Sequence, residues 1–170
     1  FVQRRPFRHE PLAPEQRRVV EHALRDFRLA GVGLDPATKQ RFKTLTSELA
    51  QLAAKFDENV LDSTNAWQKH ITDAAQLAGL NAAILQRAAQ RASDAGLPGW
   101  LLGLDQPTYV AIMTDAESRD LRREFYEAWC TRASDQGPFA GRWNNAEVMQ
   151  QILARRHEIA QLLGFRHYAD

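Results

Sequence analysis

The hydrophobic residues of this chain recur mostly at helical spacing. The clearest run follows Asp35-Pro36, where six apolar side chains three or four residues apart fall on one helix face: Phe42, Leu45, Leu49, Leu52, Phe56 and Val60. Asp35 is of the residue type that caps a helix N-terminus, and proline is tolerated at the first helical position. We therefore predict one long helix over residues 36–66.

The predicted helix is long for a chain of this size. At 1.5 Å per residue it would extend for about 46 Å, whereas a compact globule of 170 residues has a diameter of about 40 Å by the usual scaling. Two explanations stay open. Either the helix bends near Asn59, Asp62 or Asn65, or protein that this chain does not contain buries its apolar stripe.

Other segments give shorter helical signals. One helix should begin at Pro14 and end at Gly31, and others should cover residues 81–95, start at Pro107 and Ser118, and follow Trp143-Asn144-Asn145. Within the first, the apolar positions at helical spacing are Val19, Val20, Ala23, Leu24 and Phe27.

Two tryptophan segments are less helical in pattern. The stretches after Trp67 and Trp100 look extended, and a small β-hairpin between them is compatible with the pattern. Asp73 is suited to cap a brief helical turn that ends at Gly79. Because about two thirds of the chain would be helical, the predicted fold class is all-α, a multi-helix segment with one long helix.

Charge and composition exclude several classes of protein. Lys plus Arg number 22 against 21 Asp plus Glu, so the net charge of +1 argues against a dedicated nucleic-acid binder. The longest apolar stretches are only about four residues, far below the 18 or so that span a bilayer, so we expect no membrane partner. The lone Cys130 rules out a disulfide scaffold and favours a cytoplasmic location, and residues 1–9 lack the pattern of a secretory signal.

Arginines are concentrated near the start of the chain. Seven of the first 28 residues are arginine, against four acids; the arginines are at positions 4, 5, 8, 17, 18, 25 and 28. Such a face could hold phosphates, but we favour a solvated amphipathic helix on which Glu21 and Arg25 pair at i, i+4.

Catalytic motifs are missing from the chain. Of the five histidines, only His157, followed by Glu158, begins the His-Glu-x-x-His pattern of zinc peptidases, and position 161 is Gln rather than His. Cys130 has no histidine within one helical turn to generate a thiolate, so we interpret it as a small buried side chain. We predict no catalytic and no metal-ligating residue here.

The segment Thr131 to Pro138 is the most unusual polar stretch. It places hydrogen-bonding side chains around a helix end and a rigid Gly-Pro turn. The simplest interpretation is a helix C-cap and a loop whose backbone groups are satisfied locally.

Four segments carry a family resemblance. Residues 23–32, 56–65, 131–138 and 153–165 closely resemble the thimet oligopeptidase family of zinc metallopeptidases, and the resemblance runs from about Pro14 to Asp170. It implies a nearly all-helical, two-lobed hydrolase whose deep channel admits short peptides. Residues 1–170 would then be a single helical segment from the N-terminal half of such a protease.

The resemblance also implies that the catalytic part is absent. The family's zinc helix, which bears His-Glu-Phe-Gly-His, and the later glutamate ligand lie beyond the position that corresponds to Asp170, and no residue here matches them. In the whole enzyme a zinc-bound water, activated by the motif's glutamate, would attack the scissile carbonyl. We expect this chain to serve as scaffold and channel wall, to be inactive alone, and to leave its substrate-binding residues unassigned.

The missing C-terminal half would be its partner. We expect one face of the helix after Pro36 and the loop at Arg132, Asp135 and Gln136 to dock on that half. An alternative is a free-standing helical interaction or adaptor module without catalysis. A basic helical module for nucleic acid, acting through the N-terminal arginines, is a more distant third.

Overall fold

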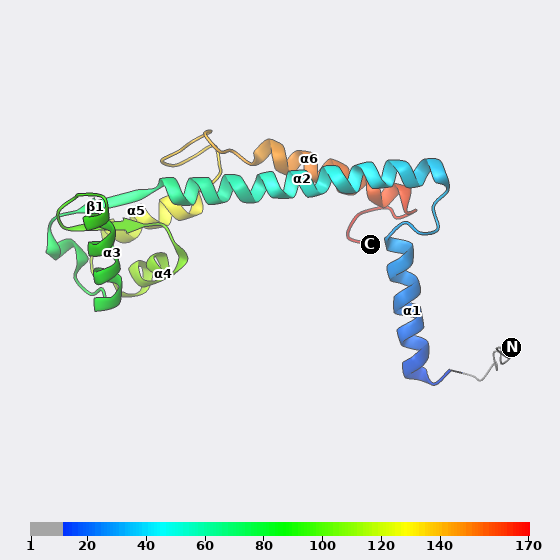
Figure 1. The fold of residues 1–170 in the computed structure, drawn as a ribbon, viewed down its shortest axis with the longest axis horizontal. Helices are drawn as coiled ribbons and strands as arrows, with labels where there is room; N and C mark the ends of the chain where they lie inside the picture. Colours follow the sequence, from blue (N-terminus) through cyan, green and yellow to red (C-terminus); the bar gives the residue numbers. More distant parts are fainter. Residues whose placement is uncertain (1–11) are drawn as a thin grey trace, which may run out of the picture. The chain divides into compact units, whose positions relative to one another are not determined.

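The computed structural model describes residues 12–170 (Figure 1). The predictions that involve Arg4, Arg5, Arg8 and His9 lie outside this range. The chain forms two compact units. The first unit contains the described residues up to position 49 together with residues 154–170, and the second contains residues 50–153. The described residues form six α-helices, one 3-10 helix (η1) and two short strands: α1 Pro14–Leu29, α2 Pro36–Ala66, β1 Gln68–Ile71, η1 Ala74–Leu77, α3 Ala82–Asp94, β2 Trp100–Gly103, α4 Gln106–Asp115, α5 Arg119–Cys130 and α6 Ala146–Leu162. The predicted all-α class is confirmed.

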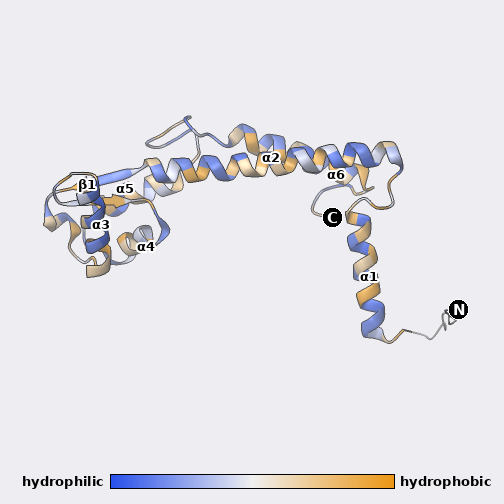
Figure 2. Cartoon of the chain, in the orientation of Figure 1, coloured by the Kyte–Doolittle hydropathy of each residue, from blue (hydrophilic) through white to orange (hydrophobic). Residues whose placement is uncertain are grey.

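Helix α1 begins at Pro14, as predicted. Its apolar positions lie in the open, with Val19 69%, Leu24 63% and Phe27 60% exposed, and none of its residues is buried. Figure 2 shows hydrophobic as well as hydrophilic residues along this helix. The sequence pattern therefore predicted the helix correctly but did not reveal that its apolar face would be uncovered.

Helix α2 has the predicted limits. Asp35 Oδ1 accepts hydrogen bonds from the N–H groups of Ala37 and Thr38, both at 3.1 Å, and so caps the first turn. The helix continues without interruption past Asn59, Asp62 and Asn65. All six residues of its apolar stripe are at least partly buried, and Leu45 is fully buried.

The two tryptophan segments pair, as expected. Strands β1 and β2 are antiparallel, with Gln68 opposite Gly103 and Ile71 opposite Trp100, and α3 lies between them in the chain. The predicted helix starts are confirmed by side-chain caps from Asn81, Asp105 and Ser118. Asp73 likewise caps η1 by accepting from the Ala75 N–H at 2.9 Å.

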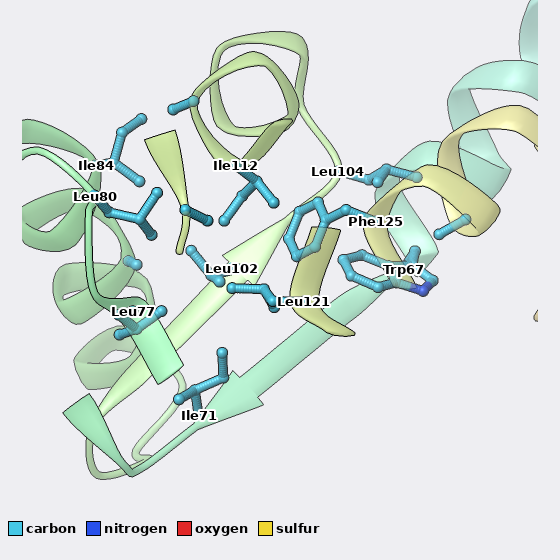
Figure 3. Close-up of a cluster of buried hydrophobic side chains, with 14 residues drawn as sticks. Trp67, Ile71, Leu77, Leu80, Ile84, Leu102, Leu104, Ile112, Leu121 and Phe125 are labelled. Atoms are coloured by element: carbon cyan, nitrogen blue, oxygen red, sulfur yellow. The ribbon is translucent and has the colours of Figure 1, made fainter. Parts of the chain in front are cut away.

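The core of the second unit gathers apolar side chains from β1, η1, α3, β2, α4 and α5 (Figure 3). Phe125 and Ile112 are fully buried, and the Trp67 ring meets Phe125 edge-on at 4.7 Å between centroids. Burying one such side chain stabilises a fold by about 1.5–3 kcal/mol. This core fixes α5 and the start of the loop that follows it.

Candidate functional site

The His157-Glu158 pair on α6 is a structural feature of the first unit. Arg41 on α2 donates to both carboxylate oxygens of Glu158, from Nε at 2.6 Å and from Nη2 at 2.8 Å. This hydrogen bonding, followed by the charge of Arg41, holds the pKa of Glu158 below its ordinary value of 4.5. The same hydrogen bond raises the pKa of Arg41.

Two other polar side chains on α6, Arg155 and Gln161, also have partners. Arg155 donates from Nε to Glu48 on α2, and the Gln161 side-chain amide donates to the Arg166 carbonyl at 3.2 Å. Glu158 is already bound in two places by a guanidinium, and Gln161 stands where a zinc motif needs histidine. These residues do not fit a zinc ion, and we derive no catalytic step through one.

Other candidate ligands lie apart. Within residues 12–170 no three His, Cys, Asp or Glu side chains come together in a way that could hold a metal ion. His70 is hydrogen-bonded to the backbone, because its Nε2 lies 2.6 Å from the Pro98 carbonyl oxygen.

Cys130 is exposed, and its interpretation as a buried side chain is wrong. It ends α5 on the face opposite the buried residues Leu121, Phe125 and Ala128. A hydrogen bond with Cys130 raises the pKa of the Tyr126 phenol one turn earlier. Because burial depends on which helix face meets the core, the residue type alone misled the prediction.

The arginines of α1 do not form the predicted pair. Arg25 binds the adjacent Asp26, with Nη2 at 3.1 Å from Oδ1, rather than Glu21. Arg28 lies over the Phe165 ring at 5.5 Å from its centroid. The described basic residues here are thus partly engaged by an acid and an aromatic ring of the same unit.

The start of the loop from Thr131 to Asn145 forms local hydrogen bonds between side chains and backbone groups, as expected of a helix C-cap. Ser134 Oγ donates to the Thr131 carbonyl at 2.8 Å and accepts from the Gln136 N–H at 3.1 Å. Thr131 Oγ1 donates back to the Glu127 carbonyl at 2.6 Å. Asp135 and Gln136 are exposed at the surface of the loop.

A buried amide pair anchors this loop to α2. Asn59 Nδ2 donates to Asn145 Oδ1 at 2.7 Å, and Asn145 Nδ2 donates to the Phe56 carbonyl at 3.1 Å. Asn145 is only 2% exposed and Asn59 5%. Sequence analysis placed Asn145 at a helix start and named Asn59 as one of three positions where α2 could bend. The 86-residue separation left no local signal for the pairing.

The first unit contains an apolar groove near the end of the chain. Its volume is about 400 Å³, and its lining includes Leu29, Phe42, Leu49, Ile159, Phe165 and Tyr168. Thr46, His167 and Asp170 also line the groove. The Asp170 carboxylate accepts a hydrogen bond from the His167 backbone N–H at 2.8 Å, and we assign no reaction to this groove.

Known proteins resemble this chain along nearly its whole length. Residues 112–170 match the sequence model of peptidase family M3. The chain is 48% identical over 154 residues to oligopeptidase A of Escherichia coli, a match that covers 91% of this chain and 23% of that protein. The predicted resemblance is confirmed.

More distant relatives carry related names. A probable cytosolic oligopeptidase A of Arabidopsis thaliana is 37% identical over 94% of the chain and 23% of its own length. A dipeptidyl carboxypeptidase of Escherichia coli is 32% identical over 93% of the chain and 23% of its own length. The chain thus spans about a quarter of the length of these curated relatives. Among the described residues, no helix is both long and apolar enough to cross a membrane.

Proposed function

We propose that this chain is a segment of an oligopeptidase A-like metallopeptidase that hydrolyses short peptides. The observation that carries the proposal is the match of 154 residues at 48% identity to oligopeptidase A. The metal of the whole enzyme would be zinc, held by residues outside this chain. The N-terminal half is the part of the enzyme to which we assign residues 1–170, as one helical segment.

In this proposal the segment is a scaffold and part of the channel wall. Two observations favour a scaffold role, because each uses polar side chains for contacts within the chain. Glu158 is bound by Arg41, and a buried amide pair holds the polar loop 131–145 to α2. The exposed face of α1 and the loop surface at Asp135 and Gln136 are available to the remainder of the enzyme. A cytosolic location fits the name of one plant relative.

A segment exchange tests the proposal. The matching 154 residues of Escherichia coli oligopeptidase A would be replaced by those of this chain, and hydrolysis of a quenched fluorescent peptide would be measured. We expect the hybrid to retain peptidase activity, because the segment supplies equivalent walls and supports. A folded hybrid that binds zinc but lacks activity would contradict the assignment.

A second experiment tests the isolated chain for peptidase activity and for bound metal. Incubated with zinc and the same peptide, it should show no turnover, while intact oligopeptidase A cleaves the peptide in a parallel reaction. Elemental analysis of the dialysed chain should find no stoichiometric metal. Turnover together with one bound metal ion per chain would show that this segment has a site of its own.

A further inference from the structure

Arg132 is held in one orientation directly after α5. Its Nε donates to the Trp129 carbonyl at 3.0 Å, and its Nη1 donates to Thr64 Oγ1 at 3.3 Å. The Thr64 hydroxyl proton is used elsewhere, since it is donated to the Val60 carbonyl at 2.7 Å, so the oxygen is free to accept. Residues from both α2 and the end of α5 therefore fix the guanidinium.

The Arg132 guanidinium stacks on the Trp129 ring. The guanidinium carbon lies 3.5 Å from the ring centroid, while the Tyr109 ring stacks on Trp129 at 4.2 Å with an interplanar angle of 12°. Two groups at these distances cannot share one face, so Arg132 and Tyr109 lie on opposite faces of the indole. Such stacking orients a guanidinium and leaves its edge available for hydrogen bonds.

This cation lacks an acidic partner within the described chain. The ion pairs formed by residues 12–170 use other arginines and lysines, and the nearest acid along the loop, Asp135, is exposed and unpaired with it. Burial lowers the pKa of Arg132, and the side chains that partly offset this effect are Cys130 and Tyr109, neither of them an Asp or Glu. Partly desolvated charges are normally paired.

The backbone beside Arg132 is strained and anchored. Ala133 is buried with φ of 51°, a left-handed conformation that costs a residue with a side chain about 1–2 kcal/mol. The carbonyl of Ala133 accepts from the Asn145 N–H at 2.8 Å, which ties it to the buried amide pair. Strained residues that surrounding structure holds in place are concentrated at ligand sites.

We propose that the Arg132 guanidinium, held by Trp129 and Thr64, is a binding site for a carboxylate. A guanidinium edge donates two parallel hydrogen bonds to a carboxylate, and such charge-assisted bonds are stronger where water is partly excluded. Nη2 has no hydrogen-bond partner among residues 12–170 and is available for this contact. The carboxylate can come from the terminus of a short peptide or from an Asp or Glu side chain of another protein segment.

The test observes Arg132 directly by NMR. In chain carrying ¹⁵N-arginine, the Arg132 Nε–H signal would be followed during titration with N-acetyl-trialanine and with its C-terminal amide. We expect a saturable shift with the free acid, weakened by added salt, and no shift with the amide. An equal response to both peptides, or none to the acid at millimolar concentration, overturns the proposal.

Two variants give a matched comparison. Arg132→Lys keeps the charge but loses the planar fork, so we expect about tenfold weaker binding of the acid. Because this variant lacks the Arg132 signal, its binding is followed in uniformly ¹⁵N-labelled chain through the backbone N–H of Ala133, which is also recorded for the wild type. Arg142, which is exposed and lies 4.3 Å from the Trp143 ring centroid, is the control, and Arg142→Gln should bind as wild type. If Arg142→Gln lost binding and Arg132→Lys did not, the carboxylate would bind at Arg142 and the proposed site at Arg132 would be refuted. The comparison of acid with amide uses the wild-type chain and does not depend on either variant folding.

A third peptide separates the two sources of the carboxylate. N-acetyl-Ala-Glu-Ala amide carries a side-chain carboxylate and no free terminus. A shift with this peptide supports recognition of acidic side chains, and a shift confined to N-acetyl-trialanine supports recognition of peptide termini. Because all the groups belong to this chain, the result is independent of whether the segment exchange yields an active peptidase.

Discussion

Asn59 and Asn145 place two amide side chains inside the second unit at a site where apolar residues would ordinarily lie. The Asn59 amide donates to the Asn145 side-chain oxygen, and Asn145 in turn donates to the Phe56 carbonyl. Truncation of one partner leaves the other buried without its hydrogen bond, which costs more than the bond itself contributes. At the scale of single residues, this pair and the hydrogen bond from Arg132 to Thr64 attach the loop 131–145 to α2.

We predict that Asn145→Ala lowers the free energy of unfolding by about 2–3 kcal/mol, from the unsatisfied Asn59 amide and the lost bond to Phe56. Asn59→Ala should cost less, because Asn145 keeps its bond to Phe56. Urea unfolding of both single variants and the double variant measures the coupling. Strictly additive effects would show that the two amides do not depend on each other.

The ion pair between Arg41 and Glu158 should make stability depend on pH. The folded-state pKa of Glu158 is lowered by the Arg41 hydrogen bond, so the pair stabilises the fold above the ordinary glutamate pKa of 4.5 that the unfolded chain has. That stabilisation is lost as the pH falls through the lowered folded-state pKa. Both side chains are more than a third exposed, so the effect is small.

We predict that Glu158→Gln lowers the urea midpoint at pH 7 and that its difference from wild type disappears as the pH falls below 4. Glu58→Gln is the control, since Glu58 lies 3.9 Å from Lys55 in an exposed pair. Parallel pH profiles for the two variants would contradict the assignment of the effect to Arg41.

At the scale of elements, the turn after α5 depends on a glycine. Gly137 has φ of 80°, and a Cβ there would lie 1.9 Å from Thr131 Oγ1, whose hydroxyl caps α5. Gly141 in the same loop has φ of 79° but meets nothing within 4 Å. The two positions therefore share one backbone conformation and differ in crowding.

We predict that Gly141→Ala costs about 1–2 kcal/mol for the left-handed conformation alone. Gly137→Ala should cost clearly more, because Thr131 must also move and give up its bond to Glu127. Thermal unfolding of both variants measures the difference. Equal losses would show that the Thr131 contact is not sterically limiting.

Element boundaries were largely predictable, because their determinants are local. Asp35, Asn81 and Ser118 each cap a helix through a backbone N–H two or three residues away, and these signals are visible in sequence. The apolar period gave the extent of α2. The period could not tell which helix face would be covered, so it did not reveal that the apolar side of α1 lies exposed, and Cys130 was wrongly predicted to be buried.

For the whole molecule, stability should be concentrated in the core of the second unit. Phe125 is fully buried there, whereas Leu24 on α1 is 63% exposed. We predict that Phe125→Ala destabilises the protein by about 3–5 kcal/mol, and that Leu24→Ala changes it by less than about 0.5 kcal/mol. Calorimetry of the two variants measures this contrast.

Hydrogen exchange provides an independent check on the same prediction. Amides of α1 should exchange faster than those of α5, since α1 has no buried residue and α5 packs three against the core. Strong protection of α1 in the isolated chain would mean that its apolar face is covered in solution.

The sequence by itself determined the helices and their caps, because these depend on residues near one another in the chain, and its motifs showed the likeness to oligopeptidase A. The pairing of the two short strands was compatible with the sequence, and the structure decided it. Only the tertiary structure decided that Arg41 meets Glu158 across 117 positions and that Asn59 meets Asn145 across 86. It also decided that Arg132 rests on Trp129 beside Thr64. Choice of a distant partner depends on how helices pack, and packing is set by the summed burial of many side chains rather than by any local pattern.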